Sequence, residues 1–480
     1  MLSSKNKVIL TPDFCVIGAG SGGLSFAAGA VQMGASVVLL ESDKMGGDCL
    51  NYGCVPSKAL IAAAKSFYEN KRAENFGWNT ESAKVDFTKL SSHIKSVIAK
   101  IAPNDSVERF EKLGVTVIKS EGQFLDKDTV KAGDILIKAK RFIIATGSSA
   151  FIPNIVGLDG VNYLTNESIF DIQSLPKRLV VIGGGPIGVE IAQAFSRLGS
   201  KVVILEAFKA LPKDDPEIIS RLKSILEEEG VDLKEKVLIN EVKQSKRTIE
   251  IHCQIGKKQH VIKASHLLVA AGRRPNLSAL NLDSAGIEYT ERGIVVDRFL
   301  RTSNKRAFAI GDCIGGYQFT HVAAYYAGLV IRNSIFRLRS TVKTIQIPWV
   351  TYTDPEIAHV GFTETELIEQ KISYKVLSMD LSENDRAHAE HKTNGQIKIV
   401  LSPTGNILGA TIMASGAGEL LTPWILAIQN NLKVSAIAGM IVPYPTMSEI
   451  SKKVASSYFK DKIFSPCMQK LVQFLLRITR

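Results

Sequence analysis

Two cysteines five residues apart, Cys49 and Cys54, are the side chains of this sequence best suited to chemistry. In a regular α-helix, residues at that spacing lie roughly 8.6 Å apart at Cα, whereas a disulfide needs about 4.4–6.8 Å. A bond between them therefore requires a bent segment, and Gly46, Gly47 and Gly53 give the backbone the freedom to bend. A pair of this kind can open and close while its backbone stays held, which indicates a redox role.

Two glycine-rich segments follow apolar runs and open expected helices, and an acidic residue follows each about 20 residues later. The first set is Gly18, Gly20, Gly23 and Glu41, and the second set is Gly183, Gly185, Gly188 and Glu206. In this motif the glycines let the backbone approach a pyrophosphate, the helix N-terminus offers free N–H groups, and the carboxylate accepts from a ribose hydroxyl. The repetition predicts two dinucleotide-binding units of strand, turn, helix and strand.

Other segments must complete these units. Buried strands that end in glycine are expected at 142–147, 266–272 and 307–312. After about residue 345 the pattern changes to alternating strands with helices expected at 416–430 and 448–458. The sequence thus predicts an α/β fold with two Rossmann-like domains and a separate C-terminal α+β domain.

Composition limits the remaining classes. The chain has 480 residues, 45% apolar and 22% charged, which is typical of a globular protein of about three domains. We expect no transmembrane helix and no signal peptide. Six cysteines are too few for a disulfide scaffold, so a reducing cytoplasm is expected. The net charge of +12 is interpreted as a solvated surface rather than a nucleic-acid site, and the dispersed histidines predict no resident metal site.

Several motifs occur in a fixed order along the chain. They are the paired fingerprints, the cysteine run with its Pro-Ser-Lys at 56–58, Ala-Thr-Gly at 145–147, Gly-Arg-Arg-Pro-Asn at 272–276 and Ile-Gly-Asp at 310–312. Together they resemble the flavin-dependent pyridine nucleotide–disulfide oxidoreductases, which include lipoamide dehydrogenase, glutathione reductase and mercuric reductase. The resemblance implies these parts: 1–150 and 276–345 for FAD, 151–275 for NAD(P), 346–463 for dimerisation, and a basic amphipathic tail at 464–480.

The resemblance also implies roles for individual residues. Cys54 would face the flavin, Cys49 would meet the substrate, and Lys58 would pair with Glu190. The residues expected to hold FAD are Gly18, Gly20, Gly23, Glu41, Gly47, Lys58, Gly122, Thr146, Gly147, Asp312 and His321. Those expected to hold NAD(P)H are Gly183, Gly185, Gly188, Glu206 and Gly272. The acidic Glu206 favours a free ribose 2′-hydroxyl, and hence NADH over NADPH.

The chain departs from the disulfide reductases near its C-terminus. They carry His-Pro-x-x-x-Glu as an acid/base motif across the dimer interface, and here Tyr444 stands in place of the histidine, with Glu449 following. The reference pKa is about 10 for tyrosine and about 6.5 for histidine, so the replacement removes a base matched to neutral pH. General base catalysis typically raises a reaction rate by about 10²–10⁴-fold. Mercuric reductases also carry tyrosine there, but they end in a vicinal cysteine pair, whereas this tail has only Cys467.

Asp48 and the tail each allow two interpretations. Asp48, where the family usually has threonine, would raise the pKa of the Cys49 thiol and assist the approach of a cation, or it would serve as a carboxylate at a helix N-terminus. The segment from Phe464 to Ile478 puts six apolar side chains on one helical face. Such a basic helix would lie on an anionic membrane or pack against its own dimer.

The sequence therefore predicts a homodimeric, FAD-dependent NAD(P)H oxidoreductase. Its electrons would pass through the Cys49–Cys54 disulfide to a small-molecule or metal-ion acceptor, as in mercuric reductase. Cys49, Cys54, Lys58, Glu190, Tyr444 and Glu449 are the expected catalytic residues. Two alternatives remain: a lipoamide dehydrogenase-like enzyme, and a flavoprotein redox sensor or electron donor for a membrane partner.

Overall fold

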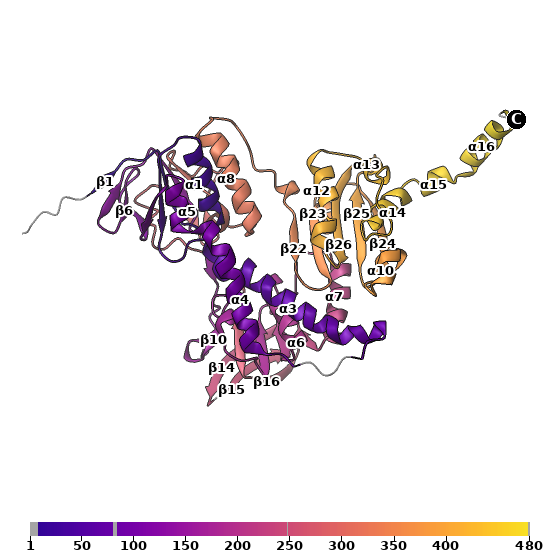
Figure 1. The fold of residues 1–480 in the computed structure, drawn as a ribbon, viewed down its shortest axis with the longest axis horizontal. Coiled ribbons are helices and arrows are strands. Elements are labelled where there is room, and N and C mark those ends of the chain that lie inside the picture. Colours follow the sequence, from indigo (N-terminus) through magenta and orange to yellow (C-terminus); the bar gives the residue numbers. More distant parts are fainter. Residues whose placement is uncertain (1–7, 80–83, 247, 479–480) are drawn as a thin grey trace, which may run out of the picture. The chain divides into compact units, whose positions relative to one another are not determined.

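The computed structural model describes residues 8–79, 84–246 and 248–478 (Figure 1). The chain divides into two compact units, and each of them is discontinuous in sequence. The first consists of Met1–Ala210 with Glu229–Val342, and the second consists of Leu211–Glu228 with Lys343–Arg480.

The first unit contains a five-stranded parallel sheet that carries the first fingerprint. Its strands, in spatial order, are β21 (Ala307–Ala309), β8 (Arg141–Ile144), β2 (Phe14–Ile17), β3 (Val37–Glu41) and β4 (Thr116–Lys119). The central strands are almost wholly buried, because helices and loops cover both faces of a parallel sheet. On one side α1 (Ser21–Gln32) packs against α8 (Thr320–Ser334), as Figure 1 shows.

A second parallel sheet in the same unit repeats this plan around the second fingerprint. Its strands are β10 (Tyr163–Leu164), β17 (His266–Val269), β11 (Arg178–Ile182), β12 (Lys201–Leu205) and β13 (Val231–Lys234). Helix α6 (Pro186–Arg197) starts directly after β11, and its proline stands in the first turn, where no N–H is needed. Because parallel strands end at one edge, both sheets bring the loops after several strands together.

The first unit also contains smaller sheets, two of which have more than two strands. One has the order β1-β7-β6-β5, and the other is the antiparallel meander β14-β15-β16. Their bounds are β1 (Ile9–Leu10), β5 (Gly122–Phe124), β6 (Val130–Ala132), β7 (Ile135–Ile137), β14 (Val237–Ser245), β15 (Thr248–Ile255) and β16 (Lys258–Ala264).

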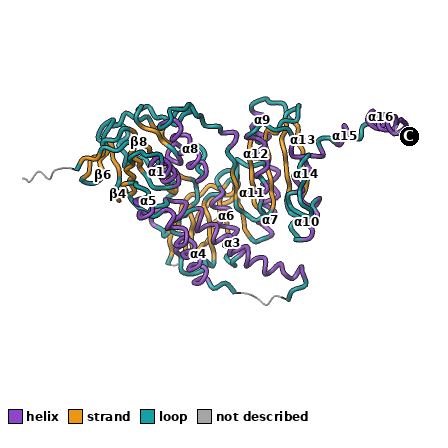
Figure 2. Tube along the Cα trace, turned by 45° about the horizontal axis from the view of Figure 1, so that its top comes forward, coloured by secondary structure: helices purple, strands orange, loops and turns teal. Residues whose placement is uncertain are grey.

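The second unit is built on a five-stranded antiparallel sheet (Figure 2, in which all strands are orange). Its strands are β22 (Trp349–Thr351), β23 (Glu356–Gly361), β26 (Ile407–Ala414), β25 (Gln396–Leu401) and β24 (Lys375–Asp380). The residues expected to be helical over 416–430 form two short helices, and those at 448–458 form one. These are α11 (Ala417–Leu420), α12 (Thr422–Gln429) and α14 (Glu449–Ser457).

Strand β25 shows how the second unit is covered on two faces. Ile397 and Ile399 join the apolar core under α11, α12 and α14. Lys398 points to the opposite face, since successive side chains of a strand alternate. There its Nζ lies 2.9 Å from Asp215 Oδ2 and 3.4 Å from Glu217 Oε2, and it also pairs with Glu364.

Helix α7 (Pro216–Glu228) therefore belongs to the second unit, although it lies between β12 and β13 in sequence. The range 151–275 expected for the nucleotide domain includes this helix. Overall, the expected fold class is confirmed: two Rossmann-like sheets and a C-terminal α+β domain. In the part of the chain that the structure describes, no helix is both long enough and apolar enough to cross a bilayer.

Candidate active site

The two cysteines lie on different helices that meet at a bend. Cys49 is half-buried on α2 (Gly47–Asn51), and Cys54 is the exposed first residue of α3 (Cys54–Arg72). The backbone enters α2 through left-handed conformations at Gly46 and Gly47, with φ of 86° and 58°. The bend required by the spacing is therefore present, and both cysteines are free thiols.

The two thiols differ in acidity. A hydrogen bond from Cys49 lowers the pKa of Cys54 to about 6, and Thr320 and the charge of Lys58 act in the same direction against burial. Cys54 Sγ lies 3.2 Å from Thr320 Oγ1, at the start of α8. The pKa of Cys49 is raised, first by the same hydrogen bond and then by burial, with the charge of Asp48 contributing. At neutral pH the pair is therefore a thiolate at Cys54 beside a protonated Cys49, as favoured by a helix N-terminus.

Lys58 connects α3, the helix that begins at Cys54, to the second fingerprint. It lies one turn beyond Cys54, and its Nζ is 3.0 Å from Glu190 Oε2. Glu190 is on α6, the helix that opens at Gly185, and only 6% of its side chain is exposed. The ion pair therefore joins α3 to α6.

A polar network beside Cys49 was not expected from the sequence. Arg273 Nη2 lies 3.2 Å from Asp48 Oδ1, and Asn166 donates to the same oxygen at 2.9 Å. Arg273 also donates from Nε to Ser148 Oγ at 2.8 Å, and Ser148 donates to Asp312 Oδ2 at 2.6 Å. Burial raises the pKa of Asp312, while Ser148 and Arg273 oppose that rise. The network links the carboxylate next to Cys49 with a residue expected to hold FAD.

The interpretations of Asp48 can now be compared with its surroundings. Asp48 lies in the first turn of α2, as a carboxylate at a helix N-terminus does. Its charge also contributes to the raised pKa of Cys49. The place at the helix N-terminus and the effect on the Cys49 pKa are thus both present, and the Asp48 carboxylate also forms an ion pair with Arg273.

The first fingerprint has the shape needed to cradle a pyrophosphate. A Cβ on Gly18 would lie 2.4 Å from the carbonyl oxygen of Ala145, and one on Gly23 would lie 1.9 Å from that of Gly18. Gly20 caps α1, and a Cβ there would meet nothing nearer than 4.0 Å. The outer glycines thus allow close packing, while Gly20 leaves the helix N-terminus open to a ligand. Glu41 Oε2 accepts from the N–H of residue 19 at 2.7 Å.

Most of the other residues expected to hold FAD lie on elements around this loop. Gly47 packs closely against Gly20, since a Cβ added to Gly47 would lie only 2.8 Å from the Cα of Gly20. Thr146, after β8, donates to the carbonyl oxygen of Asn276 at 2.8 Å, and Gly147 follows with φ of 69°. Asp312 follows β21, and His321 is in the first turn of α8 with its ring stacked on Phe319. Gly122 is buried instead among core side chains, where a Cβ would lie 2.7 Å from Leu40 Cδ1.

The second fingerprint repeats the geometry of the first. A Cβ on Gly183 would lie 2.3 Å from the carbonyl oxygen of Ala270, and one on Gly188 would lie 2.1 Å from that of Gly183. Nothing lies within 4 Å of the same position on Gly185 or on Gly272. Glu206 Oε2 accepts from the N–H of residue 184 at 2.6 Å. The residues present fit a second dinucleotide.

Tyr444 and Glu449 lie in the second unit. The Tyr444 hydroxyl donates to Asp385 Oδ2 at 3.1 Å, and this hydrogen bond raises the tyrosine pKa further above its ordinary value. The side chain is 69% exposed. Glu449 Oε2 is buried and accepts no hydrogen bond from any described residue. The carboxylate that would orient an imidazole is present, but the phenol beside it is directed to another partner.

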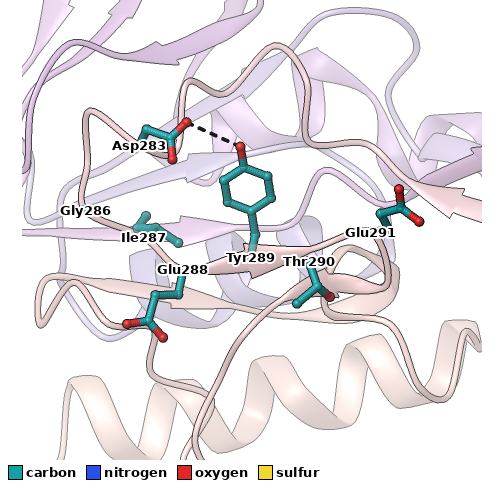
Figure 3. A pocket seen from close by; sticks show the side chains of 7 residues that line it. All are labelled: Asp283, Gly286, Ile287, Glu288, Tyr289, Thr290 and Glu291. Carbon is teal, nitrogen blue, oxygen red and sulfur yellow. Dashed lines mark hydrogen bonds between the residues drawn. The ribbon is translucent and has the colours of Figure 1, made fainter.

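The first unit also has a hollow of about 650 Å³ (Figure 3). It is lined by Asp283 and residues 286–291, and the Tyr289 hydroxyl donates to Asp283 across it at 3.3 Å. None of the residues predicted from the sequence lines it.

Comparison with known families matches nearly the whole described fold. The model described as "Pyridine nucleotide-disulphide oxidoreductase" matches residues 12–327, and the model of the corresponding dimerisation domain matches residues 347–455. The chain belongs to the pyridine nucleotide-disulphide oxidoreductase family. It is accordingly an FAD-dependent oxidoreductase that uses NAD(P)H, and its dimerisation domain supports a homodimer.

Individual members of the family are similar over most of their length. A mercuric reductase of Bacillus cereus is 37% identical over 452 residues, which are 94% of this chain and 72% of that protein. A dihydrolipoyl dehydrogenase of Staphylococcus aureus is 33% identical over 92% of this chain and 96% of its own.

Solved structures agree with these similarities. The Cu(II) complex of the HOCl-induced flavoprotein disulfide reductase RclA from Escherichia coli superposes with a TM-score of 0.84 at 25% identity, covering 93% of this chain and 99% of that one. LpdA from Mycobacterium tuberculosis gives 0.86 at 26% identity, covering 94% and 99%.

Proposed function

We propose that this oxidoreductase uses two electrons from NAD(P)H to reduce a soft metal ion held by Cys49 and Cys54. The observation that carries the proposal is Tyr444. Its hydroxyl is bound to Asp385, and its raised pKa leaves no base for the proton transfers of thiol–disulfide exchange at neutral pH. Reduction of a metal ion bound by two thiolates needs no such residue, because no substrate sulfur has to be protonated and the protons of the thiols can pass to water.

The chemistry balances at the two sulfurs. FAD, when bound, would accept the hydride of NAD(P)H and pass two electrons to the disulfide, which opens to the Cys54 thiolate and the Cys49 thiol on gaining one proton. Cys54 is already ionised near neutral pH and takes the metal first. Cys49 then releases its proton to water as its sulfur forms the second bond to the metal. Two electrons return to one Hg(II), or one each to two Cu(II), while the sulfurs close the disulfide.

Three features support this assignment. Soft thiolates suit mercury and copper. The chain is similar to mercuric reductases, and a structural neighbour was solved with Cu(II) bound. The half-exposed carboxylate of Asp48, beside Cys49, adds negative charge where a cation would arrive, although its ion pair with Arg273 offsets part of that charge. The tail has the single Cys467, so we propose a soft-metal acceptor rather than a role dedicated to mercury.

Further assignments belong to the same proposal. Glu206 accepts a hydrogen bond from the second fingerprint loop, and its negative charge would lie near the ribose of the bound dinucleotide. A carboxylate there favours the free 2′-hydroxyl of NADH over the 2′-phosphate of NADPH. Apart from Gly122, which packs among core side chains, the residues assigned to FAD and NAD(P)H in the sequence analysis keep those roles. A reducing cytoplasm suits a pair that must return to the dithiol.

The test measures NADH oxidation by the FAD-loaded dimer with Hg(II), Cu(II), lipoamide and a soluble quinone as separate acceptors. We expect turnover with a metal ion that is lost in Cys49→Ala. Faster turnover with lipoamide than with either metal would overturn the proposal in favour of a lipoamide dehydrogenase-like enzyme. Negligible turnover with all four acceptors would overturn it in favour of a redox sensor or electron donor.

The role of Tyr444 is tested by substitution. Tyr444→His restores a base and is expected to raise lipoamide turnover by about 10²-fold or more. Tyr444→Phe, the matched control, removes the hydroxyl without adding a base and should leave lipoamide turnover as low as before. An equal gain in both variants would show that the hydroxyl was merely an obstruction and would remove the main support for a metal acceptor.

A further inference from the structure

We propose that the C-terminal helix α16 (Pro466–Ile478) binds the surface of an anionic lipid bilayer, a role separate from the proposed reduction of a metal ion. The helix follows α15 (Lys460–Ile463), and none of its described residues is buried.

The apolar side of α16 is wide and open to solvent. Between 44% and 64% of each large apolar side chain from residue 471 onwards is exposed, and Phe464 before the helix is 67% exposed. At 100° per residue, the apolar positions cover more than half of the helix circumference. They are Met468, Leu471, Val472, Phe474, Leu475, Leu476 and Ile478.

The remaining side of α16 is polar and basic. It carries Lys470 and Arg477 with two glutamines, and no acidic residue occurs in the helix. Lys460 and Lys462 precede it on α15, and the last thirty residues hold seven Lys or Arg against one Asp. This excess of positive charge is half of the net charge of the whole chain and is complementary to an anionic surface.

The dimensions favour a lipid surface over other occupants. A helix of 13 residues is about 20 Å long and cannot cross a hydrocarbon core of about 30 Å. Pairing with a second helix would bury only a narrow stripe, whereas lying in the bilayer interface buries a broad face. The tail also lies beyond residues 347–455, which match the dimerisation domain.

The test measures binding of the full-length, FAD-loaded protein to vesicles of phosphatidylglycerol and phosphatidylcholine, against vesicles of phosphatidylcholine alone, by co-sedimentation. We expect binding to the anionic vesicles that weakens between 50 and about 500 mM salt, because the charges are screened. Equal binding to both vesicle types, or no binding to either, would overturn the proposal.

Two pairs of variants separate charge from apolar burial. Lys470→Gln/Arg477→Gln should weaken binding by about 30-fold, from about fivefold for each basic side chain. Its control, Lys257→Gln/Lys258→Gln, removes the same charge from two exposed residues, one in the turn after β15 and one at the start of β16, and should change binding by less than about threefold.

Leu471→Gln/Leu475→Gln should weaken binding by about tenfold for each side chain that leaves lipid. Its control is Ile368→Gln, which changes an exposed apolar residue of α9 (Glu364–Glu369) without effect on binding. NADH oxidation and FAD content should be unchanged in every variant, which separates this test from that of the proposed function. Unchanged vesicle binding in the leucine variant, or loss of the dimer in sedimentation velocity, would assign the apolar face to the protein itself and overturn the proposal.

Discussion

Replacing Cys49 with alanine removes the hydrogen bond that does most to keep Cys54 ionised. The prediction concerns the pKa of one thiol, measured while the rest of the site is unchanged. Thr320, 3.2 Å from the Cys54 sulfur, and the charge of Lys58 remain in the variant, so the pKa should rise only part of the way to its ordinary value.

The size of the rise follows from the lost hydrogen bond. Hydrogen bonds to charged groups contribute about 1.5–3 kcal/mol, which corresponds to a shift of about one to two pKa units. The pKa of Cys54 should therefore move from about 6 to about 7–8. At pH 6 the ionised fraction would fall from about one half to between about one tenth and one hundredth.

The assay is the rate of iodoacetamide labelling of Cys54 in the reduced, FAD-loaded protein as a function of pH. The midpoint is the quantity to compare, because a less acidic thiolate is a better nucleophile and partly offsets a change in rate. Cys49→Ser keeps an O–H donor and should stay within about half a unit of the native midpoint. The reasoning is refuted if the alanine variant keeps the native midpoint, or if the serine variant shifts as far.

Three further predictions concern stability, measured by urea unfolding. Arg273→Met should lower the free energy of unfolding by about 2–3 kcal/mol, because the carboxylates of Asp48 and Asp312 lose their shared cation. Arg274, on the same strand, is exposed, and Arg274→Met should change the free energy of unfolding by less than about 0.5 kcal/mol. Equal losses in the two variants would show that the contacts of Arg273 do not stabilise the protein. Lys58→Met should cost about 2 kcal/mol by removing the ammonium that lies 3.0 Å from the buried carboxylate of Glu190, and adding Glu190→Leu should recover most of that loss; a further loss in the double variant would contradict it. Burial lowers the pKa of His359 to about 4. Between about pH 6.5 and 4 the histidine is therefore protonated in the unfolded chain but neutral in the native protein. The free energy of unfolding should fall by about 3 kcal/mol as the pH drops through this range. His359→Gln should lose that slope, and an identical pH profile would show that His359 is not responsible.

The sequence predicted those parts of the fold that depend on local pattern. The apolar runs before the fingerprints became the central strands of two parallel sheets, and the spacing of Cys49 and Cys54 required the bend between α2 and α3. These features are encoded within a few dozen residues. The roles of Tyr444, Glu449 and the residues assigned to FAD and NAD(P)H remain predictions.

Contacts between distant segments could not be predicted in the same way. Arg273 reaches Asp48, Ser148 and Asp312 from a strand far from each of them in sequence. Its place in the Gly-Arg-Arg-Pro-Asn run was a signal that it mattered, but nothing local identified its partners. The assignment of α7 to the second unit was missed for the same reason, because Lys398 and its acidic partners come together only in the fold.

The position of α7 in the chain has a consequence for synthesis on the ribosome. Its inward side chains, Ile218, Ile219, Leu222 and Leu226, are buried in the native protein. Glu217 of α7 contacts Gln396 and Lys398 of β25. At about 5–20 residues per second, β25 is translated roughly ten to thirty seconds after α7. During that interval the nascent helix has apolar surface without its native cover. A fragment that starts at Lys343 would have the reverse defect, with the buried ammonium of Lys398 deprived of two of its three carboxylates.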